Sequence, residues 1–219
     1  MLLGDERAEI VRYCLRMCED DLTVGTSGNL SIRRGDLIAI TPGGVDYRTL
    51  DPEAICVIDL DGNLVDGYLE PSSEVPMHTS VYRELDARAV VHTHPMFATV
   101  LSTLVDELPP IHYMIALLGG PVRTAPYATY GSLELARNSV RGLEGRSAVL
   151  LQNHGATTIG EDLSRAYTRS LYLEWMCRVY HHACLLGRPN ILPEAEIALV
   201  AEKLASYGQS VSDRRPQAG

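Results

Sequence analysis

The segment VVHTHP at residues 90–95 carries two histidines, His92 and His94, at a spacing of two. Because alternate side chains of a β-strand point to the same face, a strand here brings both imidazoles to one place. Neutral imidazole is a common ligand of zinc and related metals, whereas an isolated pair is also typical of hydrogen-bonded structural histidines. A metal site therefore requires further ligands from elsewhere in the chain.

Two other segments offer those ligands. His154 lies in LLQNHG, where one expected strand turns into the next and Gly155 permits a tight backbone path. Glu74 ends the segment PSSE, just before a helix expected to begin at Pro76. Taken alone, Glu74 is also explained by the helix dipole, which favours a carboxylate at a helix N-terminus. In combination with the strand histidines, these residues indicate a site of three imidazoles and one carboxylate.

Glycine, hydroxyl and amide residues cluster in three segments, at residues 24–33, 41–44 and 71–74. Such segments present backbone N–H groups and short donors that can surround an anion without a P-loop lysine. Each cluster is also typical of ordinary turns. Three of them beside a histidine-bearing strand suggest a local phosphate pocket.

The bulk composition restricts the function classes. The 219 residues are 46% hydrophobic and 21% charged, as in an ordinary water-soluble domain rather than a disordered or membrane-spanning chain. A net charge of −9 argues against nucleic-acid binding, which depends on clustered Lys and Arg. We expect no signal peptide and no membrane partner. The five cysteines contain no CxxC pair and are expected to be reduced thiols in a cytoplasmic protein.

The elements that must position these residues follow from hydrophobic periodicity and turn signals. We expect helices near residues 5–20, 76–85, 96–104, 131–143, 161–186 and 193–208, and strands near 29–33, 37–40, 56–60, 89–94, 147–153 and 155–160. A short helix capped by Asp51 and a hairpin turn at 61–63 are also expected. This order predicts a single three-layer α/β/α domain over residues 1–208, with a central mixed, largely antiparallel sheet, and a flexible tail at 209–219.

Together these segments resemble the class II aldolase/adducin family over nearly the whole chain. The residues that carry the resemblance lie at 25–33, 40–47, 71–74, 90–95 and 150–155. Residues 109–120 (PPIHYMIALLGG) and 125–135 (APYATYGSLEL) are similar to the family's ketose-phosphate aldolases rather than to its epimerases or adducins. The order and spacing of five separate motifs make this assignment specific.

The resemblance implies a role for each matching residue. It implies that His92, His94 and His154 bind zinc or another divalent transition metal, and that Glu74 is both a metal ligand in the free enzyme and the acid/base. It implies that Tyr113 reaches the active site of a neighbouring subunit in a homotetramer and that Tyr207 closes over the substrate. The phosphate pocket is implied at Thr26, Ser27, Gly28, Asn29, Gly43, Gly44, Ser72 and Ser73.

The implied reaction is reversible cleavage of a ketose 1-phosphate to dihydroxyacetone phosphate and a short aldehyde. Breaking a carbon–carbon bond beside a ketone leaves an enediolate, whose charge a divalent metal stabilises as a Lewis acid. Three neutral histidines preserve the full charge of that metal and leave positions open for substrate oxygens. The expected substrate is L-fuculose 1-phosphate, which releases L-lactaldehyde.

Departures from the family pattern leave alternatives open. Gly43 replaces a common hydroxyl residue, which removes one donor to the phosphate, and Met96 and Phe97 form a less polar stretch after the histidines. 5-Deoxyribulose or methylthioribulose 1-phosphate is therefore an alternative substrate. An L-ribulose-5-phosphate 4-epimerase and a non-catalytic adducin-like scaffold are further alternatives. The four remaining histidines are interpreted as structural: His78, His112, His181 and His182.

Overall fold

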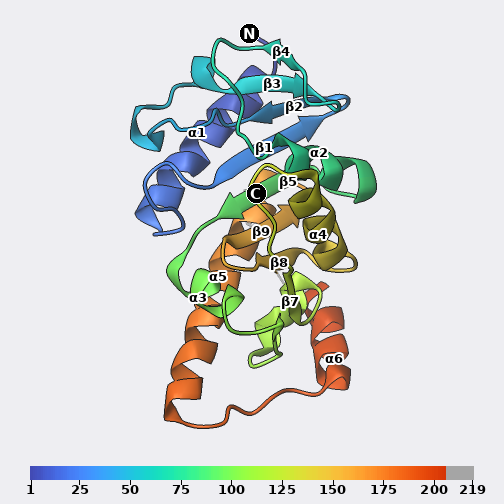
Figure 1. Ribbon diagram of the computed structural model, residues 1–219. Helices are drawn as coiled ribbons and strands as arrows, with labels where there is room; N and C mark the ends of the chain where they lie inside the picture. Colours follow the sequence, from blue (N-terminus) through green and yellow to red (C-terminus); the bar gives the residue numbers. More distant parts are fainter. Residues whose placement is uncertain (206–219) are drawn as a thin grey trace, which may run out of the picture.

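The computed structural model describes residues 1–205. Within this range, nine strands form one sheet in the order β4-β3-β2-β1-β5-β9-β8-β7-β6 (Figure 1). All neighbouring strands are antiparallel except β7 and β8, which are parallel, so the expectation of a mixed, largely antiparallel sheet is confirmed. The strands are β1 (Asn29–Arg34), β2 (Leu37–Ile40), β3 (Cys56–Asp59), β4 (Leu64–Asp66), β5 (Ala89–Thr93), β6 (Glu107–Leu108), β7 (Val122–Ala125), β8 (Ala148–Leu151) and β9 (Gly155–Gly160).

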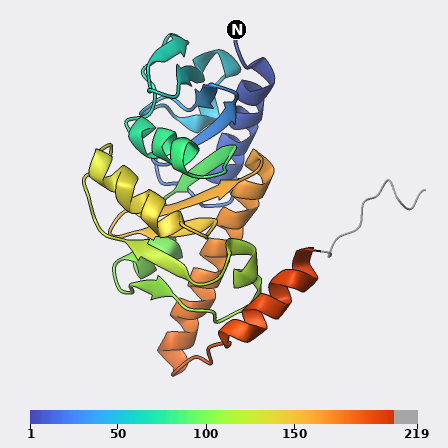
Figure 2. The ribbon, with the colours of Figure 1, turned by 90° about the vertical axis from the view of Figure 1, so that its right-hand side faces the viewer.

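Helices cover both faces of this sheet, with α2 and α4 on one side and α1 and α5 on the other (Figure 2). One hydrophobic cluster joins α2 and α4 to the sheet through residues such as Val81, Val140 and Val90. A second joins α1 and the start of α5 to the opposite face, and a third surrounds α3 and the middle of α5. The α-helices are α1 (Gly4–Glu19), α2 (Val75–Glu84), α3 (Met96–Ser102), α4 (Leu133–Leu143), α5 (Leu163–Leu186) and α6 (Glu194–Ala205).

Local sequence signals account for several helix ends. The side chains of Ser132 and Asp162 accept hydrogen bonds from backbone N–H groups in the first turns of α4 and α5, which satisfies donors that a helix leaves unpaired. Gly187 follows the last residue of α5. Asp51 caps the short helix η2 (Pro52–Ala54), as expected. This element has only three residues and is a 3-10 helix, the form that such short helical turns commonly take.

Strand β5 lies between β1 and β9, and its register sets up the site. His92 is opposite Asn29 on β1 and Thr157 on β9, and Thr93 is opposite Ala156. The expected strand at 89–94 ends at Thr93, so His94 lies just beyond it. The backbone N–H of His94 donates to the carbonyl of Leu22 at 2.9 Å instead of to a strand. The start of β1, the end of β5 and the start of β9 therefore lie next to one another, at one end of these three central strands.

Several elements were not predicted from sequence. These are the short strands β6 and β7 and two further 3-10 helices, η1 (Tyr47–Thr49) and η3 (Tyr113–Leu118). Their sequences show no clear hydrophobic periodicity. No helix in residues 1–205 combines the length and apolar character needed to cross a membrane. All five cysteines lie in this range and none is in a disulfide. Tyr207, the end of the last expected helix and the expected tail at 209–219 lie outside the described residues.

Candidate metal centre and phosphate pocket

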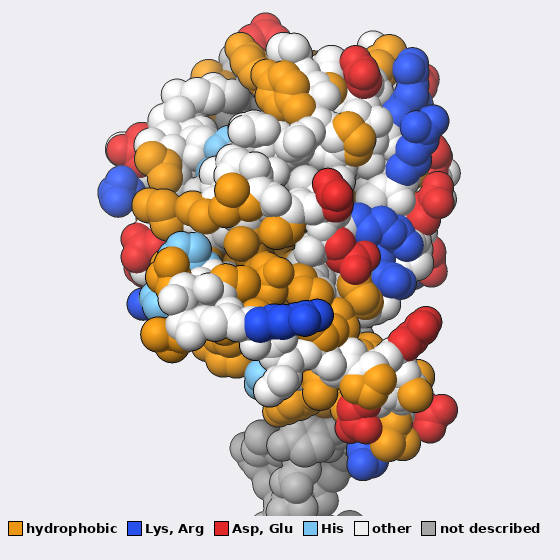
Figure 3. All heavy atoms as spheres, turned by 60° about the horizontal axis from the view of Figure 1, so that its bottom comes forward, with side chains coloured by type: hydrophobic (Ala, Val, Ile, Leu, Met, Phe, Trp, Pro, Cys, Tyr) orange, Lys and Arg blue, Asp and Glu red, His pale blue; other side chains and the backbone are white. Residues whose placement is uncertain are grey.

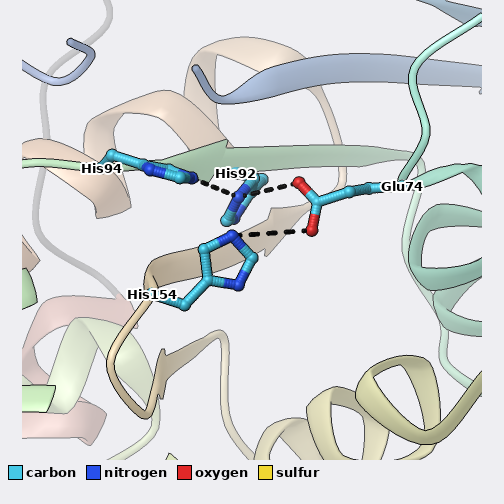
Figure 4. Close-up of side chains that lie close together, drawn as sticks. All are labelled: Glu74, His92, His94 and His154. Atoms are coloured by element: carbon cyan, nitrogen blue, oxygen red, sulfur yellow. Dashed lines mark hydrogen bonds and ion pairs between the residues drawn. The ribbon is translucent and has the colours of Figure 1, made fainter. Parts of the chain in front are cut away.

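Glu74, His92, His94 and His154 point toward one another at the edge of the sheet (Figure 4). One ligand atom from each residue lies within 4.8 Å of every other. The Nε2 atoms of His92 and His94 are 2.9 Å apart, and Nε2 of His92 is 3.0 Å from Oε2 of Glu74. Nε2 of His154 is 3.7 Å from Oε1 of the same carboxylate. Residues separated by as many as 80 positions therefore share one small volume.

Strand β9 orients the ring of His92. Its Nδ1 lies 3.0 Å from the carbonyl oxygen of Ala156, to which it donates a hydrogen bond. A ring that carries its hydrogen on Nδ1 presents a bare Nε2, and that nitrogen faces the other three side chains. His92 is fully buried, so the ring has one fixed orientation.

His154 projects from the turn between β8 and β9. Asn153, before it, has the left-handed φ of 55°, a conformation that asparagine tolerates better than most residues. Gly155, after it, packs against β5 so closely that a Cβ atom would lie 2.3 Å from the carbonyl oxygen of Thr93. This close approach, which only glycine permits, brings His154 beside His92.

Glu74 immediately precedes α2 and is buried with 5% of its surface exposed. Its Oε2 accepts a hydrogen bond of 2.9 Å from Nδ2 of Asn29. Its Oε1 is buried and has no hydrogen-bond partner. An unpartnered carboxylate oxygen in a buried position is costly unless a cation or a proton occupies it, so this atom marks a site for a positive charge.

The electrostatics of the cluster favour neutral rings at His94 and His154 beside an ionised Glu74. Burial lowers the pKa of His94 to about 3 and that of His154 to about 4, and the charges of neighbouring histidines lower both further in the same direction. Burial opposes ionisation of Glu74, whereas positive charge placed where Nε2 of His92 faces the carboxyl, together with the hydrogen bond from Asn29, holds the pKa of this carboxyl well below its usual range. Neutral imidazole and carboxylate are the forms that bind metal.

The four residues fit a divalent metal ion. Ligand atoms at about 2.0–2.1 Å from a tetrahedral zinc ion lie about 3.3 Å from one another, and the separations of 2.9, 3.0 and 3.7 Å bracket that value. The donor set of three imidazoles and one carboxylate is typical of zinc and other first-row transition metals. The unpartnered Oε1 of Glu74 completes the fit.

A cavity of about 310 Å³ opens beside this cluster. Every residue predicted for the phosphate pocket lines it, on three loops that precede β1, follow β2 and precede α2. Gly28 lies with φ of 79° against the backbone of His92, where a Cβ atom would lie 2.8 Å from the carbonyl oxygen, so the first loop touches the metal-site strand. The cavity-lining residues predicted for the phosphate pocket are Thr26, Ser27, Gly28, Asn29, Gly43, Gly44, Ser72 and Ser73.

Other predicted or overlooked residues lie as follows. Tyr113 is half exposed at the start of η3 and is not among the residues lining this cavity. Phe97 packs with the third hydrophobic cluster, and neither it nor Met96 lines this cavity. Tyr127 and Tyr130 do line it and were missed, although the segment that contains them was noted.

Comparisons with known proteins agree with this geometry. The family model of the class II aldolase and adducin N-terminal domain matches residues 8–181. The 5-deoxy-D-ribulose 1-phosphate aldolase of Bacillus thuringiensis is 41% identical, over 95% of this chain and all of that protein. The L-fuculose phosphate aldolase of Escherichia coli is 38% identical, over 94% of this chain and 96% of that protein. A solved L-fuculose 1-phosphate aldolase superposes with a TM-score of 0.91 at 42% identity, covering 94% of this chain and 98% of its own.

Proposed function

The chain belongs to the class II aldolase and adducin family, and on that premise we propose that it cleaves a ketose 1-phosphate reversibly into dihydroxyacetone phosphate and a short aldehyde. It is an enzyme of the fuculose or deoxyribulose phosphate aldolase type, a metal-dependent class. The observation that carries the proposal is the cluster of Glu74 with three histidines beside a cavity lined by hydroxyl groups and glycines.

Two substrates have nearly equal support. L-Fuculose 1-phosphate, our first expectation, is named for relatives at 38% identity, and 5-deoxyribulose 1-phosphate for relatives at 41% and 40%. The second of the latter relatives is also named for 5-methylthioribulose 1-phosphate. These substrates share the phosphate-bearing half and differ in the aldehyde that leaves. The choice among them therefore depends on contacts with the aldehyde half, for which Tyr127 and Tyr130 are available.

The loops around the cavity would hold the phosphate. Residues 26–28 and 43–44 supply backbone N–H groups and hydroxyls, and Ser72 and Ser73 add two more hydroxyls. Ser72 accepts a hydrogen bond of 3.2 Å from the N–H of Glu74, so one loop links the phosphate pocket to the acid/base. Binding the phosphate there places the adjacent ketone toward the histidine cluster.

Glu74 and three histidines, His92, His94 and His154, would hold a divalent metal, proposed to be zinc. When bound, such an ion withdraws charge from substrate oxygens as the carbon–carbon bond breaks. Glu74, once it has taken up a proton from the solvent of the cavity, would deliver that proton to the carbon that was bonded to the aldehyde half, and in the reverse direction it would remove the proton and return it to solvent.

A homotetramer in the cytoplasm, with active sites between subunits, completes the proposal. Exposed apolar side chains on η3, α5 and α6 include Tyr113, Trp175 and Leu199, and Figure 3 shows hydrophobic side chains gathered on the lower end of the molecule. Such a surface favours association. In this arrangement Tyr113 serves a neighbouring subunit by accepting the proton of the hydroxyl that becomes the aldehyde.

A cleavage assay tests the proposal. Purified zinc-loaded protein is supplied with L-fuculose 1-phosphate, 5-deoxyribulose 1-phosphate, 5-methylthioribulose 1-phosphate and L-ribulose 5-phosphate, and dihydroxyacetone phosphate is measured. We expect product from at least one ketose 1-phosphate, loss of product after metal removal and recovery after zinc is restored. No product from any ketose 1-phosphate, or conversion of the ribulose phosphate alone, contradicts the proposal.

A further inference from the structure

A continuous chain of buried hydrogen bonds runs from Tyr82 on α2 to Glu74. The hydroxyl of Tyr82 is 2.7 Å from Oγ of Ser31, and that oxygen is 2.6 Å from Nδ1 of His78. Nε2 of His78 is 2.5 Å from Oδ1 of Asn29, whose Nδ2 is 2.9 Å from Oε2 of Glu74. Three of these hydrogen bonds join α2 to β1 before the chain ends at the carboxylate.

All of its members are shielded from solvent. Ser31 and His78 are fully buried, and the exposed fraction of each of the other three residues is 5% or less. A buried polar group that loses its partner is penalised by its full desolvation cost, so each bond in such a chain constrains the next. The ring of His78 accordingly has a fixed position between Ser31 and Asn29.

Each donor in the chain is determined by the ionised state of Glu74. A carboxylate only accepts, so Asn29 must turn its amide nitrogen to Glu74 and its oxygen to His78. Nε2 of His78 must then carry the hydrogen, which leaves Nδ1 to accept from the hydroxyl of Ser31. Ser31 has no second hydrogen, so the hydroxyl of Tyr82 donates to it. Every bond thus points toward the carboxylate.

The chain makes the two oxygens of Glu74 chemically different. Oε2 accepts from Asn29, so this oxygen is held on the side of β1. Oε1 has no hydrogen-bond partner. We propose that His78 is a positioning residue which, through Asn29, keeps Oε2 as an acceptor and so fixes the orientation in which the Glu74 carboxylate faces the three histidines. This inference rests on the proposed acid/base function of Glu74.

Histidine suits this position because a neutral ring has one donor and one acceptor on opposite sides. Burial lowers the pKa of His78 to about 3, which keeps the ring neutral in the range where the enzyme would act. Lysine and arginine have no acceptor. A glutamine amide has both a donor and an acceptor, so His78→Gln can preserve the chain, whereas His78→Phe fills the space without either.

The test compares four variants: His78→Phe, His78→Gln, Tyr82→Phe and Tyr167→Phe. Tyr167 is the matched control because it is a buried tyrosine whose hydroxyl bonds to Asp20, outside the site, at 2.7 Å. Exchange of the carbon-bound protons of dihydroxyacetone phosphate with deuterium is followed by NMR. Affinity for inorganic phosphate, the melting temperature and the visible spectrum of the Co²⁺-loaded protein are recorded for each variant.

We expect His78→Phe to slow exchange about 10–100-fold, as is typical when a partner of a metal-site residue is removed. Its affinity for phosphate is expected to fall less than its exchange rate, because Asn29 is only one of the eight residues of the proposed phosphate pocket, and its Co²⁺ spectrum is expected to shift as Glu74 reorients. His78→Gln recovers most of the exchange rate and the native spectrum. Tyr82→Phe gives a smaller loss than His78→Phe, and Tyr167→Phe leaves exchange at the wild-type rate.

Wild-type exchange and spectrum in folded His78→Phe overturn the inference. Equal losses in His78→Phe and His78→Gln also overturn it, because the donor and acceptor would then have no special value. If His78→Phe does not fold, equal exchange in Tyr82→Phe and Tyr167→Phe overturns the inference instead. An inactive wild-type protein contradicts the proposed function, and in that case the Co²⁺ spectra still decide whether His78 positions Glu74.

Discussion

His92 donates its Nδ1 hydrogen to the carbonyl oxygen of Ala156 across two adjacent strands, at 3.0 Å. This bond turns the bare Nε2 of His92 toward Glu74 and His94. Such a bond on the far nitrogen of a ligand histidine fixes the ring and increases its basicity. The sheet therefore orients one of the four proposed metal ligands.

Removal of one of the three proposed histidine ligands should abolish tight metal binding. We expect His94→Ala to bind zinc more than about 100-fold more weakly than the wild type. This loss exceeds the one typical when a residue that only hydrogen-bonds to a metal ligand is removed. Because a metal that binds only the folded state stabilises it, zinc should raise the melting temperature of the wild type but not that of the variant. His182→Ala, at an exposed histidine of α5, is the control. Stoichiometric zinc in purified His94→Ala, by elemental analysis, contradicts the ligand assignment.

Glu74→Gln should separate metal binding from proton transfer. The amide has the size of the carboxyl group but cannot take up the proton, so exchange on dihydroxyacetone phosphate should fall about 10²–10⁴-fold while zinc stays bound. NMR in deuterium oxide measures the exchange. Glu161→Gln, at a glutamate paired with Arg169 outside the cavity, should exchange normally. Near-wild-type exchange in Glu74→Gln rules out its acid/base role.

Tyr113→Phe should impair cleavage and spare proton exchange. Tyr113 has 48% of its surface exposed and does not line the cavity of its own chain, which is consistent with service to a neighbouring subunit. We expect about a 10²-fold or greater loss of cleavage, as for removal of a general acid/base. Tyr68→Phe, at another exposed tyrosine, is the control. A parallel loss of cleavage and exchange would argue against this assignment.

Gly43→Ser should strengthen phosphate binding. A Cβ atom at Gly43 would lie 3.6 Å from the carbonyl oxygen of Pro71, an ordinary contact, so the cavity has room for the side chain. One added hydrogen bond is worth about 0.5–1.5 kcal/mol, or about a two- to tenfold tighter binding of inorganic phosphate by calorimetry. Gly43→Ala separates the effect of the methylene group from that of the hydroxyl. Equal affinity in the two variants means that the hydroxyl does not reach the phosphate.

Acid should destabilise the metal-free protein. Burial lowers the pKa of His78 and His94 to about 3 and that of His154 to about 4, against about 6.5 in the unfolded chain. Above pH 6.5 both states are neutral at these rings. Between about pH 6.5 and 4 the unfolded state binds protons that the folded state does not, so the free energy of unfolding falls as the pH falls.

Urea unfolding at pH 7.5 and pH 5 measures this decrease. His78 alone contributes about 2 kcal/mol of it, since one pKa unit corresponds to about 1.4 kcal/mol. His78→Gln should therefore show a decrease smaller by about that amount, and His182→Gln should match the wild type. The same decrease in His78→Gln as in the wild type would mean that His78 is protonated in the folded state.

Local patterns in the sequence predicted the elements that carry the ligands. The spacing of His92 and His94 indicated a shared strand face, and turn residues placed His154 between two strands. Helix periodicity located α1, α2, α4 and α5 within a few residues. These predictions succeeded because side-chain alternation, capping and glycine conformations depend on neighbours within a few positions. The resemblance of the motifs to a known family supplied the roles, which local patterns alone do not contain.

Tertiary structure decided which of these residues contact one another and through which hydrogen bonds. Asn29 was assigned to the phosphate pocket and His78 to a structural role, but the pairing of β1 with β5 and the packing of α2 join both to Glu74. Phe97 lies only three residues after His94, but its side chain packs against the third hydrophobic cluster and does not line the cavity. Such relationships depend on strand order and on contacts between residues more than 40 positions apart, which periodicity within one segment cannot specify.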